Sequence, residues 1–287
     1  MTSTFVLTLS CPDRTGLVYA VTRWISEAGG NILDSQQFSD PTDGEFFLRV
    51  HFDFPDSPDS PDVRDADTLR DELAQLASEH RMDVHLVVAE RALRTLVLVS
   101  KEGHCLNDLL YRQSTGSLNI EIPAVVSNHA DLERLSTSFD VPFHHVSVTD
   151  KAEAEAQLLR LVGDLEIDLV VLARYMQILT DDLCRALEGR AINIHHSFLP
   201  SFKGARPYQQ AHDRGVKLIG ATAHYVTAAL DEGPIIDQGV LRVDHRMDAA
   251  ALARAGRDVE SQTLSRAVQL HAESRVLMNG PRTVVFD

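Results

Sequence analysis

Cysteine, positive charge and long hydrophobic runs are all scarce in this sequence of 287 residues. The cysteines are odd in number, far apart and without Cys-x-x-Cys spacing: Cys11, Cys105 and Cys184. This pattern argues against a disulfide framework or a cysteine zinc cluster and indicates free thiols in a reducing compartment. No stretch approaches the roughly 20 apolar residues that span a bilayer, and the first residues lack the features of a signal peptide. We therefore expect a soluble, cytoplasmic protein with no membrane partner.

The scarcity of positive charge limits the possible ligands. Acidic residues outnumber basic ones by 42 to 27, which gives a formal net charge of -15. Such a surface argues against binding along a nucleic-acid backbone, although a local basic pocket could still hold a small anion. None of the 13 histidines shows His-x-x-x-His spacing. In an extended chain, the neighbours His195 and His196 would point to opposite faces. We therefore predict no metal site.

The first 90 residues predict a small α/β domain. Strands fit residues 4–10, 31–39, 45–54 and 82–89, and helices begin near Thr15 and around Leu69. The resulting order βαββαβ is that of a ferredoxin-like sheet with two helices on one face. We interpret the run PDSPDSPD at 55–62 as a solvated acidic loop inside this unit, because the unit is incomplete before it. The predicted domains are therefore 1–90 and 91–287.

After residue 91 the pattern changes to buried strands that alternate with helices. RTLVLVS, IPAVVSN, DLVVLAR and AINIHHS are nearly continuous apolar runs, as expected of parallel strands covered on both faces. This alternation predicts a doubly wound, Rossmann-like α/β domain. Ligands in such sheets bind beyond the carboxyl ends of the strands.

Three polar residues fall where that site is expected. Asn193 and His195 are two apart at the end of the AINIH run, so both side chains leave the same face of the strand. Asp231 follows on a loop of small residues. An amide donor, a proton-transfer group and a carboxylate that orients it suit acyl transfer or acyl hydrolysis without a Ser or Cys nucleophile. Singly, Asn193 could cap the strand, His195 could be a packed histidine and Asp231 could be a turn residue.

The segment from Asn193 to Gly204, NIHHSFLPSFKG, together with LDEGP at 230–234, resembles the formyltetrahydrofolate-dependent formyltransferase and hydrolase family. The resemblance extends from about Arg94 onward and implies a formyltransferase-type domain. It implies that Asp231 orients His195, that His195 relays protons and that Asn193 binds the oxyanion. It also implies folate contacts, which fall on Tyr175, Met176, Gln177, Ile178, His224, Thr227 and Leu230. Met176 and Ile178 could equally be core residues.

The turn before the first helix, CPDRTGL at 11–17, resembles that of an ACT regulatory domain. The resemblance implies an amino-acid effector near Asp13, Arg14 and Gly16, and it implies a homo-oligomer, either a dimer or a tetramer. These three residues could also form a plain helix-capping turn.

An ACT-like front joined to this catalytic domain resembles the deformylase branch of the family. That branch implies hydrolysis of 10-formyltetrahydrofolate to formate and tetrahydrofolate without a cofactor, which supplies formate for purine synthesis and balances the one-carbon pool. Alternatives are transfer to an amine, such as glycinamide ribonucleotide or initiator aminoacyl-tRNA, and a noncatalytic regulator. The loop 100–107 has a single glycine, and Glu102 would repel a phosphate. We interpret His104 and Cys105 as loop and helix-start residues.

Overall fold

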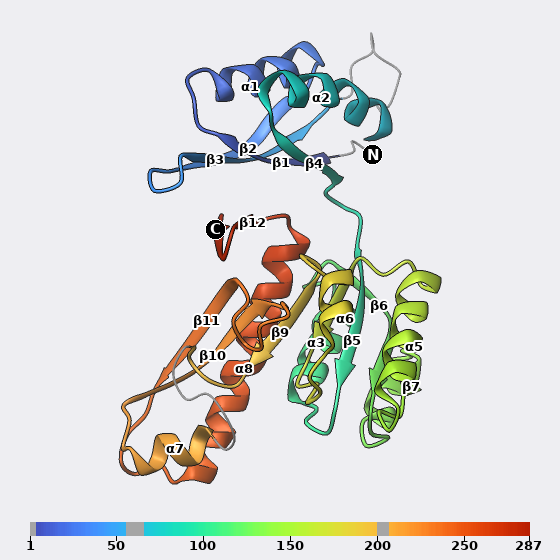
Figure 1. Cartoon of the computed structure of the whole chain (residues 1–287), viewed down its shortest axis with the longest axis vertical. Helices are drawn as coiled ribbons and strands as arrows, with labels where there is room; N and C mark the ends of the chain where they lie inside the picture. Colours follow the sequence, from blue (N-terminus) through green and yellow to red (C-terminus); the bar gives the residue numbers. More distant parts are fainter. Residues whose placement is uncertain (1–3, 56–65, 200–206) are drawn as a thin grey trace. The chain divides into compact units, whose positions relative to one another are not determined.

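The computed structural model describes residues 4–55, 66–199 and 207–287, so the run 55–62 falls, apart from Pro55, outside the described residues. The chain divides into two units. The first comprises Met1–Arg91, Glu273–Asn279 and Val284–Asp287, and the second comprises Ala92–Ala272 and Gly280–Thr283. Figure 1 shows the elements of each.

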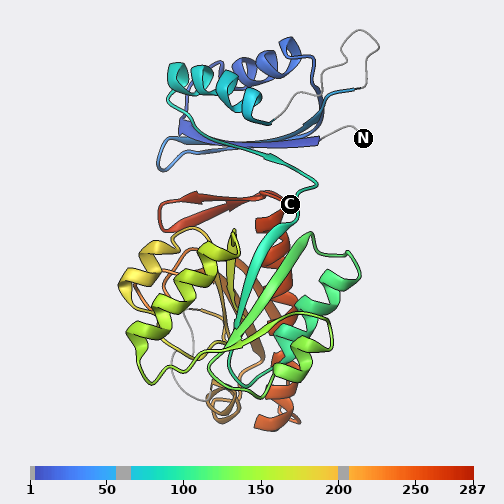
Figure 2. The same ribbon diagram turned by 90° about the vertical axis from the view of Figure 1, so that its right-hand side faces the viewer.

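The first unit has the predicted ferredoxin-like order. Its four strands pair antiparallel in the order β2-β3-β1-β4, and both helices cover one face of the sheet (Figure 2). The elements are β1 (Thr4–Pro12), α1 (Leu17–Glu27), β2 (Asn31–Asp40), β3 (Glu45–Asp53), α2 (Ala66–His80) and β4 (Asp83–Val88).

Alternation along β3 gives this sheet two different faces. Phe46, Leu48, Val50 and Phe52 join the core beneath the helices, and burying each contributes about 1.5–3 kcal/mol. Phe47 belongs to a separate cluster with residues from the end of the chain. The period of 2 in the strand therefore directs one set of side chains to the helices and the other to a second layer.

The end of the chain supplies that second layer. Strands β12 (Val276–Asn279) and β13 (Arg282–Val285) pair with each other, and Leu277 and Phe286 pack with Phe47. The guanidinium of Arg49, on the same strand as Phe47, donates to the Glu273 carbonyl at 3.0 Å. The expected division into 1–90 and 91–287 does not include this return of the chain, because local sequence pattern predicts short strands but not the sheet they pack against.

The second unit is the predicted doubly wound fold with an antiparallel extension. Its seven strands lie in the order β11-β10-β9-β8-β5-β6-β7. Strands β5 to β9 pair parallel, whereas β10 pairs antiparallel with β9 and β11. The strands are β5 (Leu93–Val99), β6 (Ile120–Ser127), β7 (Phe143–His145), β8 (Leu169–Leu172), β9 (Ala191–His195), β10 (Leu218–Tyr225) and β11 (Ile235–Arg242).

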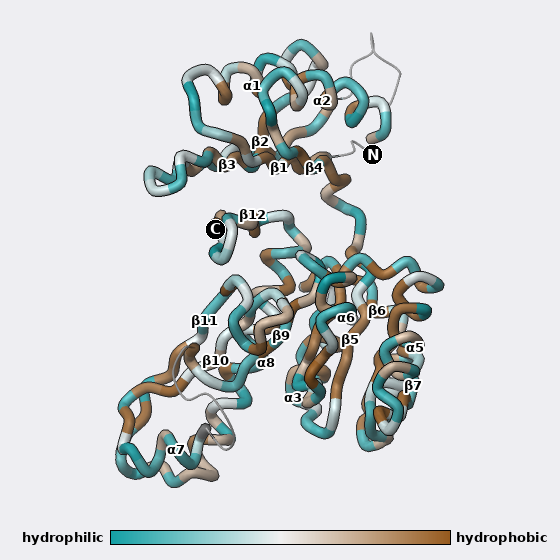
Figure 3. The backbone as a smooth tube through the Cα atoms, in the orientation of Figure 1, coloured by the Kyte–Doolittle hydropathy of each residue, from teal (hydrophilic) through white to brown (hydrophobic). Residues whose placement is uncertain are grey.

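Helices cover both faces of this sheet. One face packs against α5 and α6 and the other against α3 and α8 (Figure 2). Hydrophobic residues run along the strands, whereas the helices alternate between hydrophobic and hydrophilic positions (Figure 3). No helix among the described residues is long and apolar enough to cross a membrane. The helices are α3 (His104–Ser114), α4 (Glu133–Thr137), α5 (Lys151–Asp164), α6 (Asp181–Ala186), α7 (Pro207–Asp213) and α8 (Ala249–Ala272).

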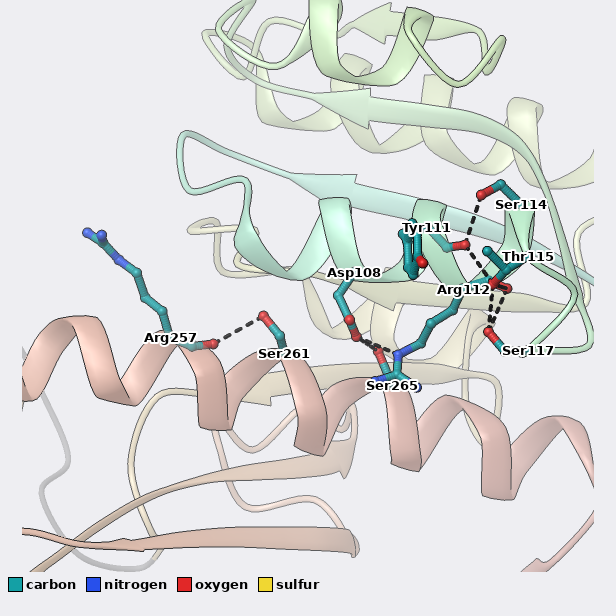
Figure 4. Close-up of polar contacts among 9 residues, drawn as sticks. All are labelled: Asp108, Tyr111, Arg112, Ser114, Thr115, Ser117, Arg257, Ser261 and Ser265. Atoms are coloured by element: carbon teal, nitrogen blue, oxygen red, sulfur yellow. Dashed lines mark hydrogen bonds and ion pairs between the residues drawn. The ribbon is translucent and has the colours of Figure 1, made fainter.

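A polar contact joins α3 to α8. The Asp108 carboxylate accepts from the Ser265 hydroxyl and from Arg112 Nε, the latter at 2.8 Å (Figure 4). This contact helps to fix the start of α3, which follows β5, against the long final helix.

The topological switch point lies between β5 and β8, since the chain extends the sheet in opposite directions from β5.

Candidate active site

The strands β9 and β10 bring the predicted catalytic residues together with a second histidine. In their antiparallel register Asn193 lies opposite His224, and His195 lies opposite Thr222. Residues directly opposite one another project from the same face. Thr222 is fully buried, donates to the Ser197 carbonyl at 3.0 Å and accepts from the Leu199 backbone at 3.1 Å. It thereby holds the segment that follows His195.

A single cavity of about 690 Å³ collects the candidate catalytic and folate-binding positions. Its walls come from the ends of β8 and β9, from β10 and from the loop after β10, at the edge of the sheet where a doubly wound fold binds ligands. Every candidate position predicted for this unit lines it: Tyr175, Met176, Gln177, Ile178, Asn193, His195, His224, Thr227, Leu230 and Asp231.

His195 and Asp231 form the central pair. His195 Nδ1 lies 3.3 Å from Asp231 Oδ2, and His195 is 6% exposed. The hydrogen bond from His195 lowers the pKa of Asp231 below its usual value, despite partial burial. Because a carboxylate only accepts, the shared proton belongs to Nδ1. His195 Nε2 then carries a lone pair, and it has no hydrogen-bond partner among the described residues.

The loop that carries Asp231 requires its glycine. A Cβ on Gly233 would lie 1.8 Å from the Tyr225 carbonyl oxygen, so any side chain would push the loop away. The Tyr225 amide instead donates to the Pro234 carbonyl at 2.9 Å, and the β10–β11 register shifts at Ala223/His224. Asp231 itself has a φ of 55°, a left-handed conformation that Asp tolerates better than most residues. The segment DEGP at 231–234 therefore suits the close approach and the backbone conformation of this turn.

The wall formed by residues 174–179 is held by a serine from the neighbouring strand end. Ser100 Oγ accepts from the Met176 amide at 2.9 Å and donates to Asn128 Oδ1 at 2.7 Å. Met176 and Ile178 are 58% and 63% exposed, so neither is a core residue. Tyr175 is buried, and burial raises its pKa to about 12. An apolar, partly exposed wall suits a flat aromatic ligand.

His196 lies differently from the sequence-based expectation. Its ring stacks on that of His195, with centroids 5.1 Å apart and planes at 26°, and it also lines the cavity. Strand alternation does not apply, because β9 ends at His195. Burial lowers the pKa of His196 to about 4, with further contributions from Arg174 and His195, so the ring is neutral at neutral pH.

A buried polar cluster around Glu260 adjoins this cavity. Glu260 is 1% exposed, and its carboxylate accepts from His104 Nε2 at 2.8 Å and from the Tyr208 hydroxyl at 2.5 Å. Arg174 Nε lies 3.4 Å from it. Burial would raise the pKa of Glu260, but these donors outweigh burial and hold it low. Tyr208 and Arg174 line the cavity, and sequence reasoning gave Tyr208 no role because no local pattern marks it.

The ligand atoms of His104, Cys105 and Glu260 lie within 4.8 Å of one another. Burial raises the pKa of the Cys105 thiol, which favours the protonated form over the thiolate that a metal requires. The Glu260 carboxylate is already engaged by its donors. His104 begins α3 and Cys105 is its second residue, so hydrogen bonding and packing account for the cluster.

The candidate effector residues lie in the turn before α1. Gly16 has a φ of 96° and precedes the helix, and Arg14 Nη2 lies 2.7 Å from His80 Nδ1. The Asp13 amide donates to the Gly44 carbonyl. Gly16 also lines a cavity of about 520 Å³ between α1 and α2, whereas Asp13 and Arg14 do not. The turn therefore has a structural role, because these contacts join it to the loop between β2 and β3 and to the end of α2.

Comparisons with known proteins match both units. A formyl transferase model matches residues 93–268, and an ACT domain model matches residues 3–87. The chain thus joins an ACT domain to a formyl transferase domain. A formyltetrahydrofolate deformylase of Corynebacterium sp. is 48% identical over 283 residues, which cover 98% of this chain and 97% of that protein.

Solved structures agree with this match. A formyltetrahydrofolate deformylase from Pseudomonas syringae pv. tomato, 45% identical, has a TM-score of 0.95 and covers 100% of this chain and 95% of that one. The chain belongs to the formyltetrahydrofolate deformylase family. Glycinamide ribonucleotide transformylase 1 from Symbiobacterium toebii is more distant, with 32% identity, a TM-score of 0.65 and coverage of 69% of this chain and 95% of that one.

Proposed function

We propose that the protein is a hydrolase that cleaves 10-formyltetrahydrofolate to formate and tetrahydrofolate, with Asn193, His195 and Asp231 as its catalytic residues. The observation that carries the assignment of roles is the His195–Asp231 pair, which leaves His195 Nε2 unpartnered among the described residues that line the cavity. Family membership along nearly the whole chain supports the reaction.

The proposed reaction uses His195 twice. His195 Nε2 takes a proton from water as the water oxygen attacks the formyl carbon, and Asp231 stabilises the imidazolium that forms. The carbonyl oxygen becomes an oxyanion, which an Asn193 N–H stabilises. When the carbon–nitrogen bond breaks, the imidazolium returns its proton to the departing folate nitrogen. The product formic acid loses its remaining proton to solvent and leaves as formate, tetrahydrofolate leaves, and His195 is again neutral.

The folate would bind along the exposed wall of the cavity. Met176, Gln177 and Ile178 offer an apolar surface with one amide, and their backbone is held by Ser100. Thr227 and Leu230 lie in the loop that carries Asp231 and would contact the other side of the pterin ring. A cavity of about 690 Å³ is of the size usual for small-molecule sites.

Transfer of the formyl group to an amine is the second candidate, because the ribonucleotide transformylase shares most of this fold. The loop after β5 favours water as acceptor. Glu102 lies in that loop, and its carboxylate is 3.2 Å from Arg257 and 3.8 Å from His104. The ion pair with Glu102 engages the Arg257 guanidinium, which could otherwise bind a phosphate, and the Glu102 carboxylate itself would repel one.

The test is an assay of purified protein with 10-formyltetrahydrofolate and no amine. We expect formate and tetrahydrofolate to appear in equal amounts, and a chelator to leave the rate unchanged because the scheme uses no metal or cofactor. If the formyl group is released only after glycinamide ribonucleotide is added, the proposal of hydrolysis is rejected in favour of transfer.

We also propose a role for the first unit in assembly and control. Strand β2 is an edge of its sheet and exposes Ile32, Leu33 and Phe38, as an interface with a second copy would. In this proposal the ACT domain assembles the protein into a dimer or tetramer and binds an amino-acid effector near Asp13, Arg14 and Gly16. The proposed cellular role is cytoplasmic: supply of formate for purine synthesis and adjustment of the one-carbon folate pool. Light scattering with and without amino acids tests the assembly.

A further inference from the structure

We propose that His224 is a positioning residue that fixes the side-chain amide of Asn193 with its N–H groups toward the substrate oxygen. This inference rests on the proposed role of Asn193 in hydrolysis. It follows from the hydrogen bonds at the two ring nitrogens of His224, which together determine the orientation of the amide.

The first of these bonds determines where His224 carries its proton. Its Nδ1 lies 2.9 Å from the backbone carbonyl oxygen of Tyr225. A carbonyl oxygen only accepts, so Nδ1 bears the hydrogen. The ring is 2% exposed, and burial lowers the pKa of His224 below its usual value, against the opposing influence of Asp231 and the Tyr225 carbonyl. A neutral ring protonated at Nδ1 has a lone pair at Nε2.

The second hydrogen bond determines the orientation of the Asn193 side-chain amide. His224 Nε2 lies 3.2 Å from Asn193 Nδ2. With a lone pair on Nε2, only the NH₂ end of the amide can face it, because the flipped amide would place two acceptors together. One N–H then binds His224, and the second remains for the formyl oxygen. An unconstrained Asn would present its own oxygen to the oxyanion in part of the population, which would oppose catalysis.

The backbone is built to keep His224 in this place. The register of β10 with β11 shifts at Ala223/His224, a bulge that redirects the side chain. Gly233 allows the next loop to pass so close that a Cβ there would lie 3.2 Å from His224 Nδ1. Asp231 Oδ1 is 3.9 Å from His224 Nε2, outside hydrogen-bond distance. Among the described residues, the hydrogen bond to Asn193 is therefore the polar contact that His224 Nε2 makes.

A matched pair of variants separates the two ring nitrogens. His224→Asn keeps a donor for the Tyr225 carbonyl but is too short to reach Asn193, whereas His224→Gln reaches Asn193 with an acceptor. We expect His224→Asn to lower kcat by about 10- to 100-fold, below the 10²- to 10³-fold typical of losing an oxyanion donor, with KM nearly unchanged. His224→Gln should recover most of that loss.

A double-mutant cycle makes the decisive comparison. If His224 acts through Asn193, then His224→Asn adds less than about threefold to the loss already caused by Asn193→Ala, because effects of residues that act as a unit are not additive. Independent, multiplicative losses, or equal losses in His224→Asn and His224→Gln, would overturn the proposal. If His224→Asn does not fold, His224→Leu, which removes both ring nitrogens at similar side-chain volume, replaces it in the cycle.

The same data separate this inference from the proposed function. Absence of formate release by the unaltered protein rejects hydrolysis. Full activity of Asn193→Ala rejects the role of Asn193 in the oxyanion site. Loss of activity in Asn193→Ala with multiplicative loss in the double variant rejects the role of His224 alone.

Discussion

At the scale of single residues, the site depends on which atoms carry protons. His195 donates from Nδ1 to Asp231, and this leaves the lone pair of Nε2 available for its proposed role as the base. The pKa of Asp231 is held low by the bond from His195, so the carboxylate is ionised at neutral pH. Its contribution to stability is present above the unfolded pKa of about 3.9 and is lost as the pH falls through the lower folded pKa.

Asp231→Asn should lower kcat by about 10³- to 10⁴-fold, because the amide oxygen can accept from the Nδ1–H tautomer of His195 while the amide NH₂ can donate to the other tautomer, so the lone pair at Nε2 is no longer fixed. Formate release at neutral pH measures the effect. The thermal midpoint serves as the control and should fall by only a few degrees, since the side chain keeps its size. Near-normal turnover with an intact fold would remove Asp231 from the mechanism.

The sequence was sufficient to predict Asn193, His195 and Asp231 as candidates, and the structure places all three around one cavity. Spacing within a strand and a motif in a loop are local features, so they are visible without coordinates. Tyr208 and Glu260 were not predicted, because their place beside the cavity depends on how α7 and α8 pack. The predicted orientation of His196 was wrong, because β9 ends at His195 and strand alternation does not extend to His196.

At the scale of elements, the junction between β10 and β11 determines where Asp231 lies. The Tyr225–Pro234 hydrogen bond closes this junction, and Gly233 allows the close approach of the two chain segments. The β-bulge at His224 belongs to the same junction. The parallel strands were predictable from their apolar runs, whereas the antiparallel pairing of β10 required the register of the whole sheet.

Gly233→Ala should lower the free energy of unfolding by about 2–4 kcal/mol and reduce kcat sharply, because its Cβ would lie 1.8 Å from the Tyr225 carbonyl oxygen. Urea unfolding and steady-state kinetics measure the two effects. Gly163→Ala is the matched control: this glycine lies in α5 with no neighbour within 4 Å of an added Cβ, and alanine there should stabilise by up to about 1 kcal/mol. Equal behaviour of the two variants would contradict this account of the turn.

At the scale of the whole molecule, the second unit keeps two partly buried histidines in neutral form. Burial lowers the pKa of His196 and of His271 to about 4, from 6.5 when exposed. His271 Nδ1 lies 2.7 Å from the Tyr225 hydroxyl oxygen, within hydrogen-bond distance. A histidine with a lowered folded pKa contributes full stability above 6.5, and stability is lost as the pH falls toward 4.

The second unit should therefore lose stability between pH 7.5 and pH 5. The cost is about 2 kcal/mol for each such histidine at pH 5, which is 1.5 pH units below 6.5 at 1.36 kcal/mol per unit. Urea unfolding at the two pH values measures the loss. His271→Gln keeps an acceptor for Tyr225 without a titrating ring, and it should reduce the loss by about one histidine's share. An unchanged loss in this variant would assign the acid sensitivity to other groups.

The membership of Glu273–Asn279 and Val284–Asp287 in the first unit has a consequence for biosynthesis. The ribosome completes the sheet of β1 to β4 early, yet Leu277 and Phe286, which cover Phe47, emerge only after the whole of Ala92–Ala272. At 5–20 residues per second this interval is roughly 10 to 40 seconds. During that time Phe47 lacks the two side chains that cover it, so we expect the nascent sheet to present an apolar site to chaperones until translation of this stretch is finished.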